Sequence, residues 1–200
     1  ILATVCVLYN NETDLFSNEH IRMAFDLAID RTAVTKAAGA ENRAATGLVP
    51  HGIPDAGETE DDFRTTGGTL CAIDEESLGE RQDKAREELT FAGYYSNAMF
   101  PPIELLYVSG TENDAVAALL QQTWSSVLSV NVMLHGVTQA EYDSRMEEGN
   151  YELALKKVTA LYDDAMSFLD RWCSEDEQNL IGYENGTYDV LLGVARTSEN

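Results

Sequence analysis

The sequence predicts an α/β fold with a mainly parallel sheet flanked by helices. Three observations between residues 101 and 158 support this: short apolar runs alternate with amphipathic ones, the amphipathic runs follow capping residues, and the strands are too apolar for two exposed faces. Strands joined by helices require right-handed crossovers, which make the strands parallel. The expected order is strand Ile103–Val108, helix Glu112–Leu128, strand Val130–Val137, helix Gln139–Glu147 and strand Tyr151–Val158.

The first helix of this series has the clearest pattern. Its apolar residues recur at the spacing of one helix face, at Val116, Leu119, Leu120, Trp124, Val127 and Leu128. Thr111 and Asp114 predict a capping box at its start, and Thr138 and Glu141 predict another at the start of the second helix. Gly149 is expected to end the second helix in the left-handed conformation.

The flanking regions predict further elements. Ile1–Tyr9 has the composition of a buried strand, and an amphipathic helix capped by Ser17 or Asn18 should follow, with a second short helix beginning at Asp30. Ala45–Pro54 should be extended, and Asp55–Leu70 should be a solvated loop. A helix that starts at Asp74 or Ser77 should end at Gly93, and two short helices are expected at Ala165–Trp172 and Tyr188–Ala195.

Composition limits the possible partners. The chain has 13 basic and 35 acidic residues, a formal net charge of −22 and a pI near 4.2. Phosphate backbones and anionic membranes would repel such a chain, so we expect no nucleic-acid partner. The acidity is consistent either with attraction of cationic ligands or with solubility outside a cell.

Length and the first residues bear on domain organisation. Two hundred residues can bury the core of one domain, and we expect residues 1–200 to form a single α/β lobe. No apolar run approaches the length of a membrane span, and no signal peptide is evident. Because the first residues already resemble a buried strand, we expect the chain to be a piece of a longer protein.

Catalytic and metal-binding patterns are weak. There is no GxSxG motif, and the three histidines lack the spacing of a base with its orienting carboxylate. We expect His20 at the surface and His135 in a structural role, whereas His51 is either a plain loop residue or a ligand contact. The cysteines, Cys6, Cys71 and Cys173, are too scattered for zinc, although Cys71 and Cys173 could pair in an oxidising compartment. No metal or cofactor is expected.

Two adjacent carboxylates follow the last strand of the series. Asp163 and Asp164 lie beyond a strand end, where open α/β sheets place their ligands. They could also cap the short helix that begins at Ala165. The sequence leaves both roles open.

Several segments, in order along the chain, carry motifs of one known family. They are Ala28–Arg31, Ala45–Pro50, Ala92–Tyr94, Leu120–Trp124, Val130–Val132, Tyr142–Ala154, Ser167–Asp170 and Gly182–Asp189. Together they resemble the extracytoplasmic solute-binding proteins of bacterial peptide-type ABC importers, the oligopeptide and dipeptide class. The resemblance covers nearly the whole chain and implies a periplasmic-binding-protein-like fold.

The resemblance implies a function without covalent chemistry. In that family two lobes close on a peptide or peptide-like solute and deliver it to a membrane permease. The chain would be part of the second lobe, with the first lobe absent. We accordingly expect a monomeric binding protein rather than an enzyme, in the periplasm or on the cell surface as a lipoprotein.

One departure from the family bears on the ligand. The aspartate with which peptide-binding members hold the peptide's amino terminus aligns with Leu161, which cannot pair with an ammonium group. Either Asp163 or Asp164 replaces it, or the ligand lacks a free amino terminus. The predicted ligand-binding residues are Thr159, Ala160, Leu161, Tyr162, Asp163, Asp164 and His51.

Two other function classes remain possible. The same fold could serve as the sensing domain of a regulator or receptor, which residues upstream of the chain would reveal. An α/β hydrolase is a third possibility, which an absence of turnover of esters and peptides would exclude.

Overall fold

The computed structural model describes most of the chain, which divides into two compact units. The described residues are 2–55, 61–95, 99–110 and 112–197. Unit 1 comprises Ile1–Cys6, Ala45–Ala72 and Lys157–Asn200, and unit 2 comprises Val7–Ala44 and Ile73–Lys156. The expectation of a single lobe over residues 1–200 stays a prediction.

A four-stranded sheet confirms the α/β class. Its strands are β1 (Ala3–Tyr9), β2 (Ile103–Val108), β3 (Val132–Val137) and β4 (Leu153–Thr159), in the order β1-β4-β2-β3. β2 pairs in parallel with both β3 and β4, in register from Ile103 opposite Val132 to Val108 opposite Val137 on the β3 side. β1 runs antiparallel to β4, because the amide of Ala160 bonds to Leu2 and the amide of Asn10 bonds to Glu152. The sheet is therefore mostly parallel, with one antiparallel edge.

Unit 2 contains five helices among its described residues: α1 (Glu19–Leu27), α2 (Arg31–Ala38), α4 (Leu78–Phe91), α5 (Asn113–Leu128) and α6 (Gln139–Glu147). Asn18, Asp30 and Thr138 cap α1, α2 and α6 through their side chains, as predicted. α5 differs, because its N-cap is Glu112 and makes no side-chain capping bond. The predicted capping residue Thr111 lies outside the described residues.

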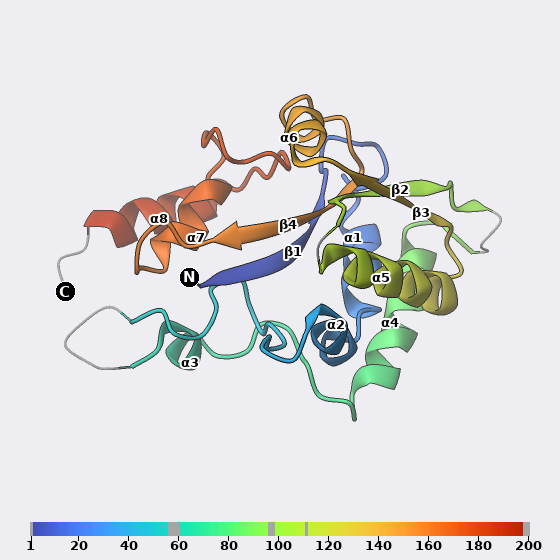
Figure 1. The fold of residues 1–200 in the computed structure, drawn as a ribbon, viewed down its shortest axis with the longest axis horizontal. Coiled ribbons are helices and arrows are strands. Elements are labelled where there is room, and N and C mark those ends of the chain that lie inside the picture. Colours follow the sequence, from blue (N-terminus) through green and yellow to red (C-terminus); the bar gives the residue numbers. More distant parts are fainter. Residues whose placement is uncertain (1, 56–60, 96–98, 111, 198–200) are drawn as a thin grey trace. The chain divides into compact units, whose positions relative to one another are not determined.

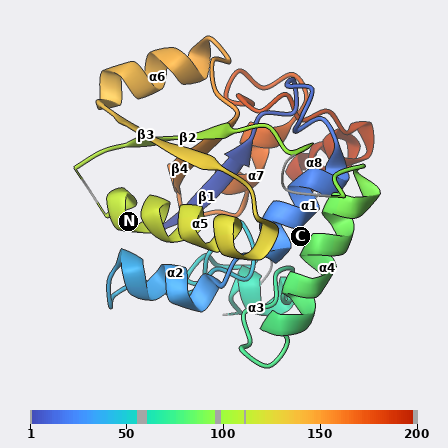
Figure 2. The same ribbon diagram turned by 90° about the vertical axis from the view of Figure 1, so that its right-hand side faces the viewer.

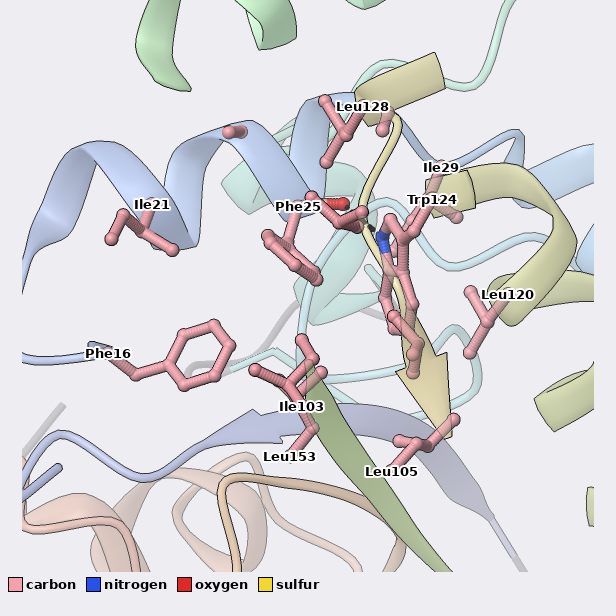
Figure 3. Close-up of a cluster of buried hydrophobic side chains, with 14 of the residues drawn as sticks. Phe16, Ile21, Phe25, Ile29, Ile103, Leu105, Leu120, Trp124, Leu128 and Leu153 are labelled. Atoms are coloured by element: carbon pink, nitrogen blue, oxygen red, sulfur yellow. Dashed lines mark hydrogen bonds between the residues drawn. The ribbon is translucent and has the colours of Figure 1, made fainter. Parts of the chain in front are cut away.

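Unit 2 has one large apolar core on the α5 face of its strands. α5 packs against β2 and β3, whereas α6 contacts β2 from the opposite side (Figures 1 and 2). Trp124 is fully buried and donates from Nε1 to the carbonyl of Phe25 at 2.9 Å (Figure 3). The rings of these two residues lie 5.1 Å apart. The apolar stripe read from the sequence therefore forms the centre of this core.

Two glutamates in unit 2 pair with histidines. His20 contacts the carboxylate of Glu88 at 2.6 Å, and that carboxylate is almost fully buried. His20 is thus a partly exposed partner of a buried acid, not only a surface residue. Glu104 contacts His135 at 2.9 Å and Arg145 at 2.6 Å, which confirms a structural role for His135.

Unit 1 contains shorter helices: α3 (Phe63–Gly67), α7 (Met166–Leu169), the 3₁₀ turn η2 (Asp170–Trp172) and α8 (Gly186–Thr197). The prediction of a plain solvated loop over Asp55–Leu70 is wrong where α3 forms. Asp62 caps α3, and Arg64 is buried to 5% exposure. A Cβ atom on Gly47 would lie 2.0 Å from the Arg64 guanidinium, so a larger residue there would displace that side chain.

Two further observations concern the described residues. None of their helices has both the length and the apolar composition needed to cross a bilayer. Cys6, Cys71 and Cys173 form no disulfide, so Cys71 and Cys173 are not joined in this structure.

Candidate functional site

The candidate site is built on the loop that follows β4 in unit 1. Hydrogen bonds hold the backbone of this loop at successive residues. The amide of Ala160 donates to the carbonyl of Leu2 at 2.9 Å, and the amide of Leu161 donates to Ser167 Oγ at 2.6 Å. Arg171 is buried and donates to the carbonyls of Ser167 and Thr159. The loop is therefore a fixed surface.

Four consecutive side chains of this loop are exposed, at residues 161–164. Leu161 is 73% exposed and Tyr162 is 51% exposed. Asp164 Oδ1 accepts from the amide of Met166, the first residue of α7, at 2.7 Å, although the N-cap residue of this helix is Ala165. Asp164 is therefore engaged with the start of the helix. Asp163 is exposed, and its side chain makes no hydrogen bond or ion pair with a residue that the structure describes. The sequence left the same two roles open for both carboxylates, but in the structure only Asp164 is bonded to the start of α7.

Tyr162 has a charged neighbourhood. Its hydroxyl lies near the carboxylate of Asp170, which Arg196 pairs with at 2.9 Å. Partial burial, and next the negative charges of Asp170 and Asp164, raise the pKa of the Tyr162 hydroxyl. The phenol therefore remains neutral and can donate a hydrogen bond.

The predicted residue His51 pairs with an acid that the sequence did not indicate. His51 Nδ1 lies 3.1 Å from Asp62 Oδ1, which also accepts from the amide of Thr65 at 3.0 Å. Asp62 Oδ2 accepts from the amide of Gly52. These bonds, the Gly52 amide first and then the Thr65 amide and His51, lower the pKa of Asp62 from the ordinary 3.8 to about 2.

One apolar cluster supports both predicted segments of the site. Its buried members are Val49, Ile53, Val158, Ala165 and Phe168, all within unit 1. Val49 and Ile53 flank His51 on either side, whereas Val158 and Ala165 flank the loop after β4. We call Thr159–Asp164 and Thr46–His51 together the candidate wall. Both of its segments are anchored on the same core.

The lowered pKa of Asp62 predicts how the stability of the fold changes at acidic pH. A depressed pKa in the folded state stabilises the fold above the unfolded value of 3.8, and this contribution is lost as the pH falls to about 2. We expect Asp62→Asn to lower the melting temperature at pH 6 and to have little effect at pH 2. Melting curves of both proteins across this range test it, and a difference independent of pH would contradict it.

Sequence reasoning missed three residues that shape the wall. Asp62, Ser167 and Arg171 each act through a hydrogen bond to a wall residue or its neighbour. Aspartate is among the residues preferred at N-cap positions, which could have indicated that Asp62 begins a helix. No local pattern could have assigned its contact with His51.

A known family matches most of the chain. A family model described as "Bacterial extracellular solute-binding proteins, family 5 Middle" matches residues 2–179. The chain belongs to this family. Family 5 is the group that the sequence motifs resembled, and its matched region includes every residue of the candidate wall.

Relatives and solved structures agree with this membership. The chain is 25% identical over 191 residues to the dipeptide-binding protein DppE of Bacillus subtilis, covering 94% of this chain and 33% of DppE. It is 27% identical over 190 residues to the probable deoxycholate-binding periplasmic protein YgiS of Escherichia coli, with coverage of 94% and 33%. It thus spans about a third of the length of these curated relatives.

The fold is shared with solved peptide-binding proteins. Haemophilus influenzae OppA, solved in complex with RPPGFSPFR, superposes with a TM-score of 0.88 at 23% identity, over 100% of this chain and 38% of OppA. The Escherichia coli murein tripeptide binding protein MppA gives 0.85 at 20% identity, over 100% and 37%. At these identities the likeness establishes the fold.

Proposed function

We propose that this chain is part of the second, solute-binding lobe of an extracytoplasmic protein that delivers peptides or peptide-like solutes to an ABC importer. The observation that carries the proposal is the family 5 match over residues 2–179. Relatives named for dipeptide and oligopeptide binding support the solute class. Closure around the solute and release to a membrane permease need no covalent step, so the role is that of a binding protein in the periplasm or in a surface lipoprotein.

The candidate wall is the proposed solute contact. Its segment Thr159–Asp164 follows the carboxyl end of β4, where open α/β sheets bind ligands. Thr159 and Ala160 contribute backbone, Leu161 and Tyr162 an apolar and aromatic surface, and Asp163 a free carboxylate. His51 contributes an imidazole from the second segment. Asp164 is engaged at α7 and is expected to act through the shape of the loop.

A second candidate is a solute without a free amine. Leu161 exposes 73% of its surface where the resemblance places an amine-binding aspartate. One relative is named as probably deoxycholate-binding, which shows that not every relative is named for a peptide. A solute with an apolar ring system would pack on the exposed side chains of Leu161 and Tyr162, whereas Leu161 offers no partner for a charged amine.

Comparing peptides with a free and with a blocked amino terminus tests these two candidate solutes. In the full-length protein that carries this chain, we expect free and N-acetylated tripeptides to bind within about tenfold of each other, or about 1.4 kcal/mol. Leu161→Asp should then favour the free amine by about 2–5 kcal/mol, since a desolvated charge pair is worth that much when one partner is removed. Isothermal titration calorimetry with both peptides and with deoxycholate measures this.

The adjacent carboxylates supply a matched control. Asp163→Asn and Asp164→Asn change the same charge one residue apart, but only Asp164 bonds to a helix amide. We expect Asp163→Asn to weaken the binding of a cationic peptide without a change in melting temperature. Asp164→Asn weakens the acceptor of the Met166 amide and should lower the melting temperature. An absence of binding to every peptide and to deoxycholate would contradict the proposed function.

A further inference from the structure

The His51–Asp62 pair presents one unused ring nitrogen. The contact of the ring with Asp62 is made through Nδ1, at 3.1 Å. No residue that the structure describes pairs with Nε2. The His51 side chain is 47% exposed, whereas that of Asp62 is 26% exposed. The Nδ1 atom of the His51 imidazole is therefore engaged by Asp62, and part of the ring is open to solvent.

Asp62 is held too firmly to serve as a solute contact itself. Its two oxygens accept from the amides of Gly52 and Thr65 and from the Thr65 hydroxyl, besides facing His51. The amide of Phe63 also bonds to the carbonyl of Ile53 at 2.9 Å, which fixes the backbone beside the pair. The remaining effect of this carboxylate is on the imidazole.

We propose that Asp62 is a positioning residue that holds His51 in the Nδ1–H tautomer, so that Nε2 accepts a hydrogen bond from an N–H group of the solute. An ionised carboxylate can only accept hydrogen bonds, so the proton of a neutral ring must be on Nδ1 and the lone pair on Nε2. A solute anion at Nε2 would be repelled by Asp62 and by a chain of net charge −22, so a donor group is favoured. This inference rests on the proposed function, because the solute supplies the donor.

The tautomer provides the first test. Side-chain ¹⁵N NMR of the 200-residue chain is expected to show His51 with its proton on Nδ1. Asp62→Ser keeps a residue that caps α3 but removes the carboxylate, so the ring should shift towards the Nε2–H form. Asp61→Ser makes the same charge change at an exposed neighbour and should leave the tautomer unchanged. An Nε2–H ring in the unaltered chain would overturn the proposal.

Titration with two peptides tests the contact. Trialanine and N-acetyl-trialanine, added at millimolar concentration, are expected to move the Nε2 signal of His51. A response to both peptides identifies a backbone amide as the donor, and a response to trialanine alone identifies the ammonium. Asp62→Ser should weaken the binding of the responding peptide about threefold to tenfold, the size of one hydrogen bond, and Asp61→Ser should not.

The two possible failures are distinct. If the amide signals of Thr159–Asp164 move while the Nε2 signal does not, the inference is wrong and the proposed function stands. If the full-length protein that carries this chain binds either peptide by calorimetry but no signal of the candidate wall moves, the wall is not the solute contact and the role of Nε2 is rejected. If the full-length protein binds neither peptides nor deoxycholate, the proposed function itself is contradicted.

Discussion

Replacing Trp124 by alanine is expected to lower the free energy of unfolding by about 3–5 kcal/mol, the usual cost of removing a buried aromatic ring. Trp124 is completely buried at the centre of the unit 2 core, where its ring packs on Phe25 at 5.1 Å (Figure 3). Alanine would leave a cavity between α5 and α1 and would also remove the donor to the Phe25 carbonyl. Urea unfolding followed by the amide signals of β2 measures this loss within unit 2.

Two controls separate volume from hydrogen bonding. Trp124→Phe keeps most of the ring but leaves the Phe25 carbonyl without its donor, which should cost about 1–3 kcal/mol. Trp172→Phe changes the chain's other tryptophan, which is partly exposed, and should cost less. If Trp124→Ala destabilised the protein no more than Trp172→Phe, the assignment of Trp124 to the core centre would be wrong.

The sequence was sufficient for the elements of unit 2 because their signals are local. The stripe that includes Val116, Leu120 and Trp124 repeats at helical spacing, and these residues are buried in α5. Short apolar runs became β2, β3 and β4, of which β2 contacts α5 and α6, and β3 contacts α5. The antiparallel direction of β1 was not predictable, because no helix crossover precedes it in the chain and its partner β4 is about 150 residues away.

The candidate wall was predictable only in part. The position of Thr159–Asp164 after a strand follows from a general rule for α/β sheets, and the structure places these residues directly beyond β4. The structure also separates Asp164, which bonds to the amide of Met166, from Asp163, which does not. That difference depends on where α7 begins to within one residue, and composition does not determine it.

The polar contacts between residues far apart in the chain could not be predicted from the sequence. His51 and Asp62 lie eleven positions apart in the chain. Their contact accompanies the hydrogen bond from the Phe63 amide to the Ile53 carbonyl, which no local pattern predicts. The bond from Arg171 to the Thr159 carbonyl similarly depends on how the η2 turn folds back. Arginine in a helix is usually at the surface, so its burial here could not be anticipated from residue type.

The unit 1 core leads to the second large effect, because it supports both segments of the wall. Phe168 is fully buried among Val49, Ile53, Val158 and Ala165. Phe168→Ala is expected to lower the free energy of unfolding of unit 1 by about 3–5 kcal/mol. The cavity would lie under α7, whose Ser167 hydroxyl holds the amide of Leu161. Loss of packing at Phe168 should therefore loosen the wall as well as destabilise the unit.

Hydrogen exchange distinguishes this coupling from a general loss of stability. In Phe168→Ala, protection of the Leu161 amide should fall by the factor that corresponds to the lost free energy, about tenfold for each 1.4 kcal/mol. Phe91→Ala removes an aromatic ring that is 70% exposed in unit 2 and should change stability by no more than about 0.5 kcal/mol. Unchanged protection at Leu161 in Phe168→Ala would mean that the loop after β4 holds its shape without this core, and that the wall depends on the Ser167 and Arg171 hydrogen bonds alone.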